Sequence, residues 1–149
     1  MKRTTGIMLS LAILFPIYAH ALENPVAMIK ISTGTGNIIR NGVSMEAKKG
    51  AELFQRDSLK TGADGSISVI FKDDTLISIG PNSELAINEF LYSPADGKLS
   101  FITRLLKGTS AYVSGIIGKL SPQSVRFETP VANIGIRGTK FAVKLEEVD

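Results

Sequence analysis

Few residues of this chain belong to the types that perform covalent catalysis or bind transition metals. The chain has no cysteine, and its one histidine is His20, close to the N-terminus. A serine–histidine–aspartate triad or a cysteine–histidine pair therefore cannot form from the residues after position 20. Zinc, haem and iron–sulfur sites lack their usual ligands in the same part of the chain. The groups left for chemistry are carboxylates, glycine-bearing loops and basic side chains.

Two pairs of adjacent carboxylates are the main candidates for acid–base chemistry or calcium binding. Asp73-Asp74 follows an alternating apolar run, which predicts a hairpin tip with solvated charges. A calcium site would need several more oxygen ligands at suitable spacing, and none surround this pair. Glu146-Glu147 is expected to be a solvated tail. Distant carboxylates can meet in a fold, as in glycosidases, but nothing here favours that, so we expect a non-enzymatic protein without metal or cofactor.

Two glycine-bearing segments resemble phosphate-binding loops only in part. Gly34-Thr35-Gly36 has Ile39 where a dinucleotide-binding motif would carry its third glycine. The segment 115–119 ends in Gly-Lys, but the first glycine of a P-loop is replaced by Val113 and its Ser/Thr by Leu120. Both segments are interpreted as turns or loops, and no nucleotide is expected.

Basic side chains are scattered along the chain instead of forming a patch. The formal net charge is +3, and removal of Lys2 and Arg3 with a signal would leave 15 basic and 14 acidic residues. A nucleic-acid platform would need clustered charge with interleaved exposed aromatic residues. We therefore expect no nucleic-acid partner, and side chains such as Arg40 are expected on solvated strand faces.

The N-terminus has the pattern of an export signal. Lys2 and Arg3 precede an apolar run from Ile7 to Tyr18, and Ala19-His20-Ala21 supplies the small residues that a signal peptidase needs. The run is short for a membrane anchor, and no cysteine follows it to carry a lipid. Residues 1–21 are predicted to be a cleaved signal helix and residues 22–149 a single domain. The mature protein is then expected to be periplasmic or secreted and not membrane-spanning.

The pattern of the mature chain predicts strands separated by turns. In 65–71 the residues Ile67, Val69 and Phe71 alternate with serines, and turn chemistry follows at 72–74 and again at 80–83. Similar alternation recurs up to position 145, and only Met45–Phe54 has a weak helical preference, interrupted by Gly50. The expected fold is all-β, with about ten or more short strands in one compact domain. A sandwich, a barrel and a short β-solenoid all stay open.

The second half of the chain contains further strand predictions. Gly108 is expected to open a strand that carries Ala111 and Val113, followed by a loop over 115–122. Alternating apolar residues predict two later strand faces. These residues are Val125 and Phe127 in the first strand, and Phe141, Val143 and Leu145 in the second.

The segment 128–141 is the most distinctive part of the sequence. Pro130 cannot donate to a β-ladder and should start a strand or lie on an edge. Gly135 and Gly138 permit a bulge or a close backbone approach. Arg137, flanked by Ile136, is predicted to be partly buried and to make a bidentate contact with backbone acceptors. A role in holding the fold is favoured over direct ligand contact.

The same segment resembles the signature of the FecR domain family, in which a TP-x-A motif is followed by RGT-x-F. Upstream segments are also similar to family motifs: 36–42, the D-x-L-x-T-G run 57–62, the hairpin 71–76 with Asp74 where glycine is usual, 80–85 and 106–108. The likeness covers roughly residues 34 to 145. The residues that match the terminal motif are Thr129, Pro130, Ala132, Arg137, Gly138, Thr139 and Phe141.

The resemblance implies an exported FecR-domain protein that acts as a binding or sensory module in the cell envelope. The family's iron-dicitrate regulator has a cytoplasmic anti-sigma segment and a membrane helix where this chain has its predicted signal. Binding of a sigma factor is therefore not expected. The partner would be an envelope protein or a glycan. The alternative is a structural or assembly protein that pairs with another β-rich envelope protein through an exposed strand edge.

Overall fold

The structure is a computed structural model, and it describes residues 23–137 and 140–146. These residues form an all-β fold with one short helix and two 3₁₀ turns at Pro94–Asp96 and Pro122–Ser124, which confirms the expected class. The strands are β1 (Ala27–Thr33), β2 (Gly36–Arg40), β3 (Val43–Glu46), β4 (Glu52–Leu53), β5 (Ser58–Thr61), β6 (Ser66–Phe71), β7 (Leu76–Ile79), β8 (Glu84–Ser93), β9 (Lys98–Val113), β10 (Val125–Glu128), β11 (Asn133–Gly135) and β12 (Lys140–Leu145), and the helix is α1 (Ile116–Leu120).

The predicted signal segment 1–21 lies outside the described residues. Among the residues that are described, no helix has the length and apolar character needed to cross a bilayer.

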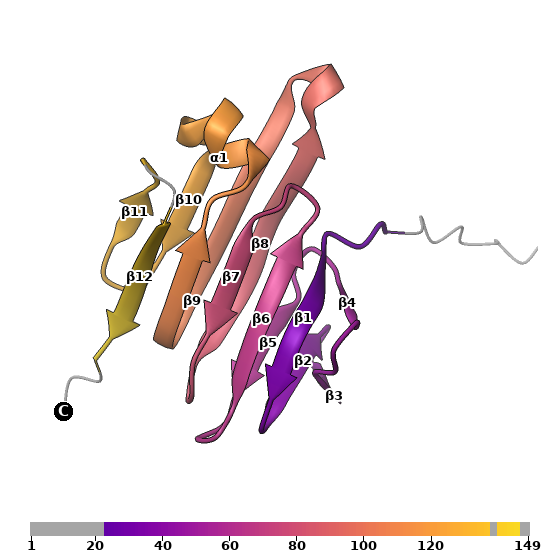
Figure 1. Cartoon of the computed structure of the whole chain (residues 1–149), viewed down its shortest axis with the longest axis vertical. Coiled ribbons are helices and arrows are strands. Elements are labelled where there is room, and N and C mark those ends of the chain that lie inside the picture. The colour runs from indigo at the N-terminus through magenta and orange to yellow at the C-terminus, as the bar shows by residue number, and fades with distance from the viewer. Residues whose placement is uncertain (1–22, 138–139, 147–149) are drawn as a thin grey trace, which may run out of the picture.

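The strands form one sheet that curls over itself into two layers (Figure 1). One layer has the order β4-β1-β6-β7-β9-β12, and the other has the order β3-β2-β5-β8-β9-β10-β11. The 16-residue strand β9 belongs to both, because its first half pairs with β8 and β10 and its second half with β7 and β12. The fold is therefore a sandwich of two layers, one of the architectures that the sequence left open.

The sheet passes from one layer to the other near Gly108, in the middle of β9. Gly108 has a φ of 86°, which interrupts the strand's regular alternation. Before it, Phe101 and Leu105 point into the core; after it, Tyr112 does. The prediction that a strand begins at Gly108 was wrong, because Gly108 lies inside β9. Ala111 and Val113, which that strand was expected to carry, are exposed and partly buried, because the irregularity at Gly108 moves the inward face to the even-numbered residues.

The core lies between the two layers, and the alternation predicted for 65–71 is confirmed. Ile67, Val69 and Phe71 are buried, while the serines between them stay partly exposed. Aromatic rings connect the layers: Phe71 of one layer lies edge-on to Phe101 of the other, with ring centroids 4.6 Å apart. Such edge-to-face pairs stabilise the fold by more than the burial of their apolar area alone. The buried faces of both layers therefore form one continuous core.

Two local predictions need correction. The weak helical preference over Met45–Phe54 does not produce a helix, because this stretch contributes to the short strands β3 and β4 and turns at Gly50, whose φ is 87°. The loop expected over 115–122 contains helix α1. Its first turn is stabilised by Asp73 of the β6–β7 turn. The backbone N–H of Ile116 donates to the Asp73 carbonyl at 2.7 Å, and that of Ile117 donates to the Asp73 carboxylate at 3.1 Å. Tertiary contacts thus stabilise a helix that is too short to form alone.

Candidate functional site

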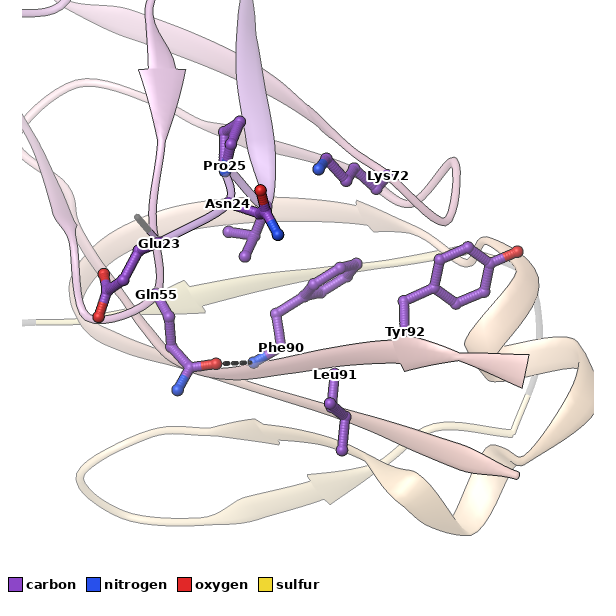
Figure 2. Close-up of a pocket in the computed structure, with 9 residues that line it drawn as sticks. Glu23, Asn24, Pro25, Gln55, Lys72, Phe90, Leu91 and Tyr92 are labelled. Atoms are coloured by element: carbon purple, nitrogen blue, oxygen red, sulfur yellow. Dashed lines mark hydrogen bonds between the residues drawn. The ribbon is translucent and has the colours of Figure 1, made fainter. Parts of the chain in front are cut away.

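A hollow of about 420 Å³ opens at the end of the sandwich beside β1 and β8 (Figure 2). Its volume lies within the range of small-molecule sites, which runs from about 300 to 1,000 Å³. Four separate segments line it: the approach to β1, the loop before β5, the turn after β6, and the second half of β8. The lining residues are Glu23, Asn24, Pro25, Val26, Gln55, Lys72, Phe90, Leu91 and Tyr92.

The aromatic side of the hollow depends on a bulge in β8. Leu85 and Ile87 point into the core, as predicted, but the pairing of β8 with β9 shifts register between Ile87 and Glu89. The extra residue turns the following even-numbered side chains inward, so that Phe90 and Tyr92 lie on the same side of the strand. In Figure 2 both rings point towards Pro25 and Lys72, whereas Leu91 points away.

Phe90 forms the floor of the hollow. It is only 7% exposed and lies edge-on to Phe101, with centroids 5.2 Å apart. The ring of Tyr92 is half-buried and lies 6.4 Å from that of Phe90, so one edge of the hollow is an accessible aromatic surface.

Backbone contacts fix the polar rim around these rings. The Oε1 atom of Gln55 accepts a hydrogen bond from the backbone N–H of Phe90 at 3.2 Å (Figure 2). The backbone N–H of Lys72 donates to the carbonyl of Val26 at 3.0 Å, which ties the turn after β6 to the chain before β1. The rim therefore presents an amide, an ammonium group and a carboxylate, that of Glu23, around an apolar floor. This combination suits binding of a polar ligand that has a flat apolar face.

None of the residues that line this hollow was predicted from the sequence to belong to a site. A signal for Phe90 and Tyr92 was present, because the apolar alternation of Leu85 and Ile87 resumes one position out of phase, which is typical of a bulge. The proximity of Lys72 and the segment before β1 depends on pairing between distant strands and has no local signal.

Asp73 is buried, and the expectation of a solvated hairpin tip was wrong for this residue. Its carboxylate accepts hydrogen bonds from the N–H of Thr75 at 3.1 Å, the hydroxyl of Thr75 at 2.8 Å and the N–H of Ile117 at 3.1 Å. Asp74 is exposed, with a φ of 67°. Asp73 therefore joins the β6–β7 turn to α1. Nowhere in residues 23–137 and 140–146 do three or more acidic or histidine side chains gather at a spacing that suits a metal.

Arg40 also differs from its expected position on a solvated face. Its Nε and Nη2 atoms donate to the two carboxylate oxygens of buried Asp57, at 2.9 and 2.7 Å. The guanidinium also lies 4.5 Å from the centroid of the Phe54 ring. The hydrogen bond to Asp57 raises the pKa of Arg40. This bidentate pair joins β2 to the start of β5, and Asp57 opens the D-x-L-x-T-G run.

Further residues of the family-like motifs hold turns together. The hydroxyl of Thr61 donates to the carbonyl of Gly80 at 2.6 Å and accepts from the N–H of Ser83 at 2.9 Å. The hydroxyl of Ser83 in turn accepts from the N–H of Thr109 at 2.9 Å. These bonds tie the β7–β8 turn to β5 and to the crossing point of β9.

The TP-x-A motif closes the hairpin between β10 and β11. The backbone N–H and the hydroxyl of Thr129 both donate to the carbonyl of Ala132, at 2.8 and 3.0 Å, and the hydroxyl accepts from the N–H of Ala132 at 3.0 Å. Pro130 and Val131 lie exposed at the tip. The expectation that Pro130 starts a strand or lies on an edge is replaced by a turn position, where its fixed φ is useful.

At the end of the segment 128–141, Phe141 packs against the core whereas Arg137 lies on the surface. The ring of Phe141 stacks on Tyr112, with centroids 4.9 Å apart and planes at 16°. Arg137 is exposed, so the partly buried position expected for it is not observed. Gly138 and Thr139 lie outside the described residues. The structure therefore brings Thr129 and Ala132 together in one turn and places Phe141 elsewhere, against β9; a contribution of Arg137 to stability stays a prediction.

One comparison with known proteins gives a match. The family model described as FecR protein matches residues 57–149, well over half of the chain. The similarity noted for 36–42 lies before this region. No curated protein and no solved structure shows significant similarity to this chain.

Proposed function

Because the chain belongs to the FecR family, we propose that it is an exported, non-enzymatic FecR-domain protein that acts as a binding or sensory module in the cell envelope. The basic start, short apolar run and Ala19-His20-Ala21 support export. The absence of cysteine from the sequence, and of histidine after position 20, supports a binding role over a catalytic one.

The observation that carries the binding role is the hollow with Phe90 as its floor and Tyr92 at its edge. Its partner in this proposal is a glycan. Sugar rings have a flat C–H face that packs on aromatic rings, and hydroxyl groups that bond to amides and charged groups. The half-buried ring of Tyr92 supplies the first kind of contact, and the rim residues Asn24, Gln55 and Lys72 supply the second.

Binding is tested by titrating the purified chain with N-acetylglucosamine oligosaccharides while following backbone amide signals by NMR. Shifts should concentrate at Lys72, Phe90 and Tyr92. Tyr92→Ala should weaken binding by about tenfold, equivalent to roughly 1.4 kcal/mol. The control Val131→Ala removes an exposed apolar side chain from the distant β10–β11 turn and should change nothing. Shifts scattered over the surface, or equal affinity for parent and Tyr92→Ala, would reject a glycan site here.

Export is tested separately by mass spectrometry of the protein from the periplasmic or secreted fraction. The expected N-terminus is Leu22. An intact Met1 on a cytosolic protein would contradict export without affecting the binding experiment.

A further inference from the structure

The outer edge of β12 is unpaired along the whole strand in the part of the chain that the structure describes. Strand β12 pairs with β9 over six residues, and no other described strand pairs with it. The other strands at the ends of the two layers are shorter: β11 has three residues, β4 has two, and β3 has four. Unpaired edges present backbone donors and acceptors to other chains unless prolines, bulges, inward charges or unmatched charged side chains, especially lysines, oppose pairing. Strand β12 contains no proline and no bulge, and both of its lysines lie on the exposed face.

The backbone groups that face this edge follow from the pairing of β9. The carbonyl of Thr109 accepts a hydrogen bond from the N–H of Gly80, on the β7 side of the strand. Neighbouring strand residues direct their backbone groups to opposite sides, so Ser110 faces β12, where its partner is Val143. Val143 therefore bonds to β9, and the residues on either side of it point outward. The strand residues with outward-facing backbone groups are Lys140, Ala142 and Lys144.

The core is open beside this edge. Phe141, Val143 and Leu145 lie on the inward face of β12 and pack against the core, but each stays partly exposed. A strand added along β12 would cover the remaining exposed part of these side chains.

We propose that β12 pairs antiparallel with β12 of a second copy, about a two-fold axis through Val143. In this register Lys140 lies opposite Glu146 of the second copy, and Phe141 lies opposite Leu145. Each of these contacts occurs twice, because a two-fold interface is self-complementary. Opposite charges and apolar pairs directly across a ladder both stabilise it.

Neighbouring registers are less favourable. An axis through Ala142 places Lys140 opposite Lys144, and an axis through Lys144 places two lysines opposite each other; like charges across a ladder are destabilising. If one strand is shifted by a single residue relative to the other, Phe141 lies opposite Lys144 of the second copy. The core-facing side of one strand would then lie beside the solvent-facing side of the other. Among the registers that pair most of β12, the charge pattern therefore favours the axis through Val143, and nothing in this pattern selects a different β-rich protein.

This pairing goes beyond the proposed binding role and does not depend on it. The hollow lies beside β1 and β8, and β12 lies at the opposite end of the layer from β1 (Figure 1). Both surfaces can be occupied at once.

The test is a charge-reversal cycle followed by sedimentation velocity over a series of protein concentrations. The parent should form a dimer. Lys140→Glu places Glu opposite Glu146, Glu146→Lys places Lys opposite Lys140, and each should raise the dimer dissociation constant by roughly tenfold or more, since two contacts are reversed. The double variant restores opposite charges and should recover the parent dimer.

A second variant probes the backbone edge directly. Ala142→Pro removes an N–H that points away from β9, so it should abolish the dimer while the monomer stays folded, as followed by circular dichroism. A parent that stays monomeric at every concentration would overturn the proposal. So would a dimer that resists both charge reversals, because its interface would then lie elsewhere. The charge cycle decides the question even if Ala142→Pro does not fold, because both charged positions are exposed.

Discussion

Ser83 fills the space that a side chain on Gly108 would need. A Cβ atom at Gly108 would lie 2.1 Å from the Ser83 hydroxyl oxygen and 2.6 Å from its Cα, closer than real contacts allow. Gly108 lies where β9 passes from one layer to the other, and Ser83 holds the β7–β8 turn against it through Thr109. The absence of a side chain at one position therefore permits both the crossing of β9 and the packing of the turn on it.

Gly108→Ala should destabilise the fold strongly. The positive φ alone costs about 1–2 kcal/mol for a residue with a Cβ, and displacing Ser83 should add about 1–3 kcal/mol. Gly50→Ala is the matched control, because Gly50 has nearly the same φ, 87°, with no atom within 4 Å of the added Cβ. Urea denaturation should show the larger loss of unfolding free energy for Gly108→Ala. Equal losses would mean that the contact with Ser83 is unimportant.

Arg40→Ala should leave the buried carboxylate of Asp57 without its cationic partner. Breaking a fully buried pair costs about 3–5 kcal/mol, and because the Arg40 side chain is 30% exposed we expect a smaller loss, about 2 kcal/mol. Arg40→Lys should recover part of that loss, because an ammonium group keeps the charge but cannot make the bidentate contact. Thermal denaturation measures both variants, with exposed Arg126→Ala as the control, for which a change below about 0.5 kcal/mol is expected. A melting temperature for Arg40→Ala equal to that of the control would contradict this role.

Asp73→Asn should destabilise the fold more than the same substitution at the exposed neighbour Asp74. The amide replaces one of two oxygens that accept three hydrogen bonds, which leaves a buried donor unsatisfied at a cost of about 1–3 kcal/mol. Asp74→Asn is the control, since Asn tolerates the positive φ at that exposed position. Chemical denaturation should rank Asp73→Asn well below Asp74→Asn. If both variants unfold with the parent, the carboxylate does not anchor α1.

Tyr112 should make the fold sensitive to alkali. Burial raises the pKa of its phenol. The pKa of Tyr112 in the folded protein therefore lies above its value in the unfolded chain, which is about 10. The contribution of Tyr112 to the free energy of unfolding is complete below pH 10 and is lost as the pH rises above it. Unfolding free energies measured between pH 8 and 11 should therefore fall less steeply for Tyr112→Phe than for the parent.

Tyr112→Phe should also cost little at neutral pH. The Tyr112 hydroxyl is buried without a hydrogen-bond partner among the described residues, so its removal leaves no donor or acceptor unpaired there. Parallel pH profiles for the two proteins would show that Tyr112 does not titrate in this range on unfolding.

Local sequence patterns predict that the chain consists of strands and turns, and which residues of several strands point inward. Ile67, Val69 and Phe71 are buried as predicted, and so are Val125 and Phe127. The turn at 80–83 was also predicted correctly from Gly, Pro, Asn and Ser. These features depend on neighbouring residues alone, because a strand's two faces alternate with a period of two and each turn type favours particular residues.

Tertiary structure decided the features in which that alternation breaks or distant segments meet. Gly108 reverses the inward face of β9, and the bulge after Ile87 turns Phe90 and Tyr92 towards the hollow. Asp73 and Arg40 were expected to be solvated charges, yet each makes a hydrogen bond to a residue of another element, which is buried for Asp73 and partly buried for Arg40. One inserted residue moves every following side chain of the strand to the opposite face. A charged group is buried only where a partner from another part of the chain pairs with it. Both depend on long-range strand pairing, which local periodicity does not encode.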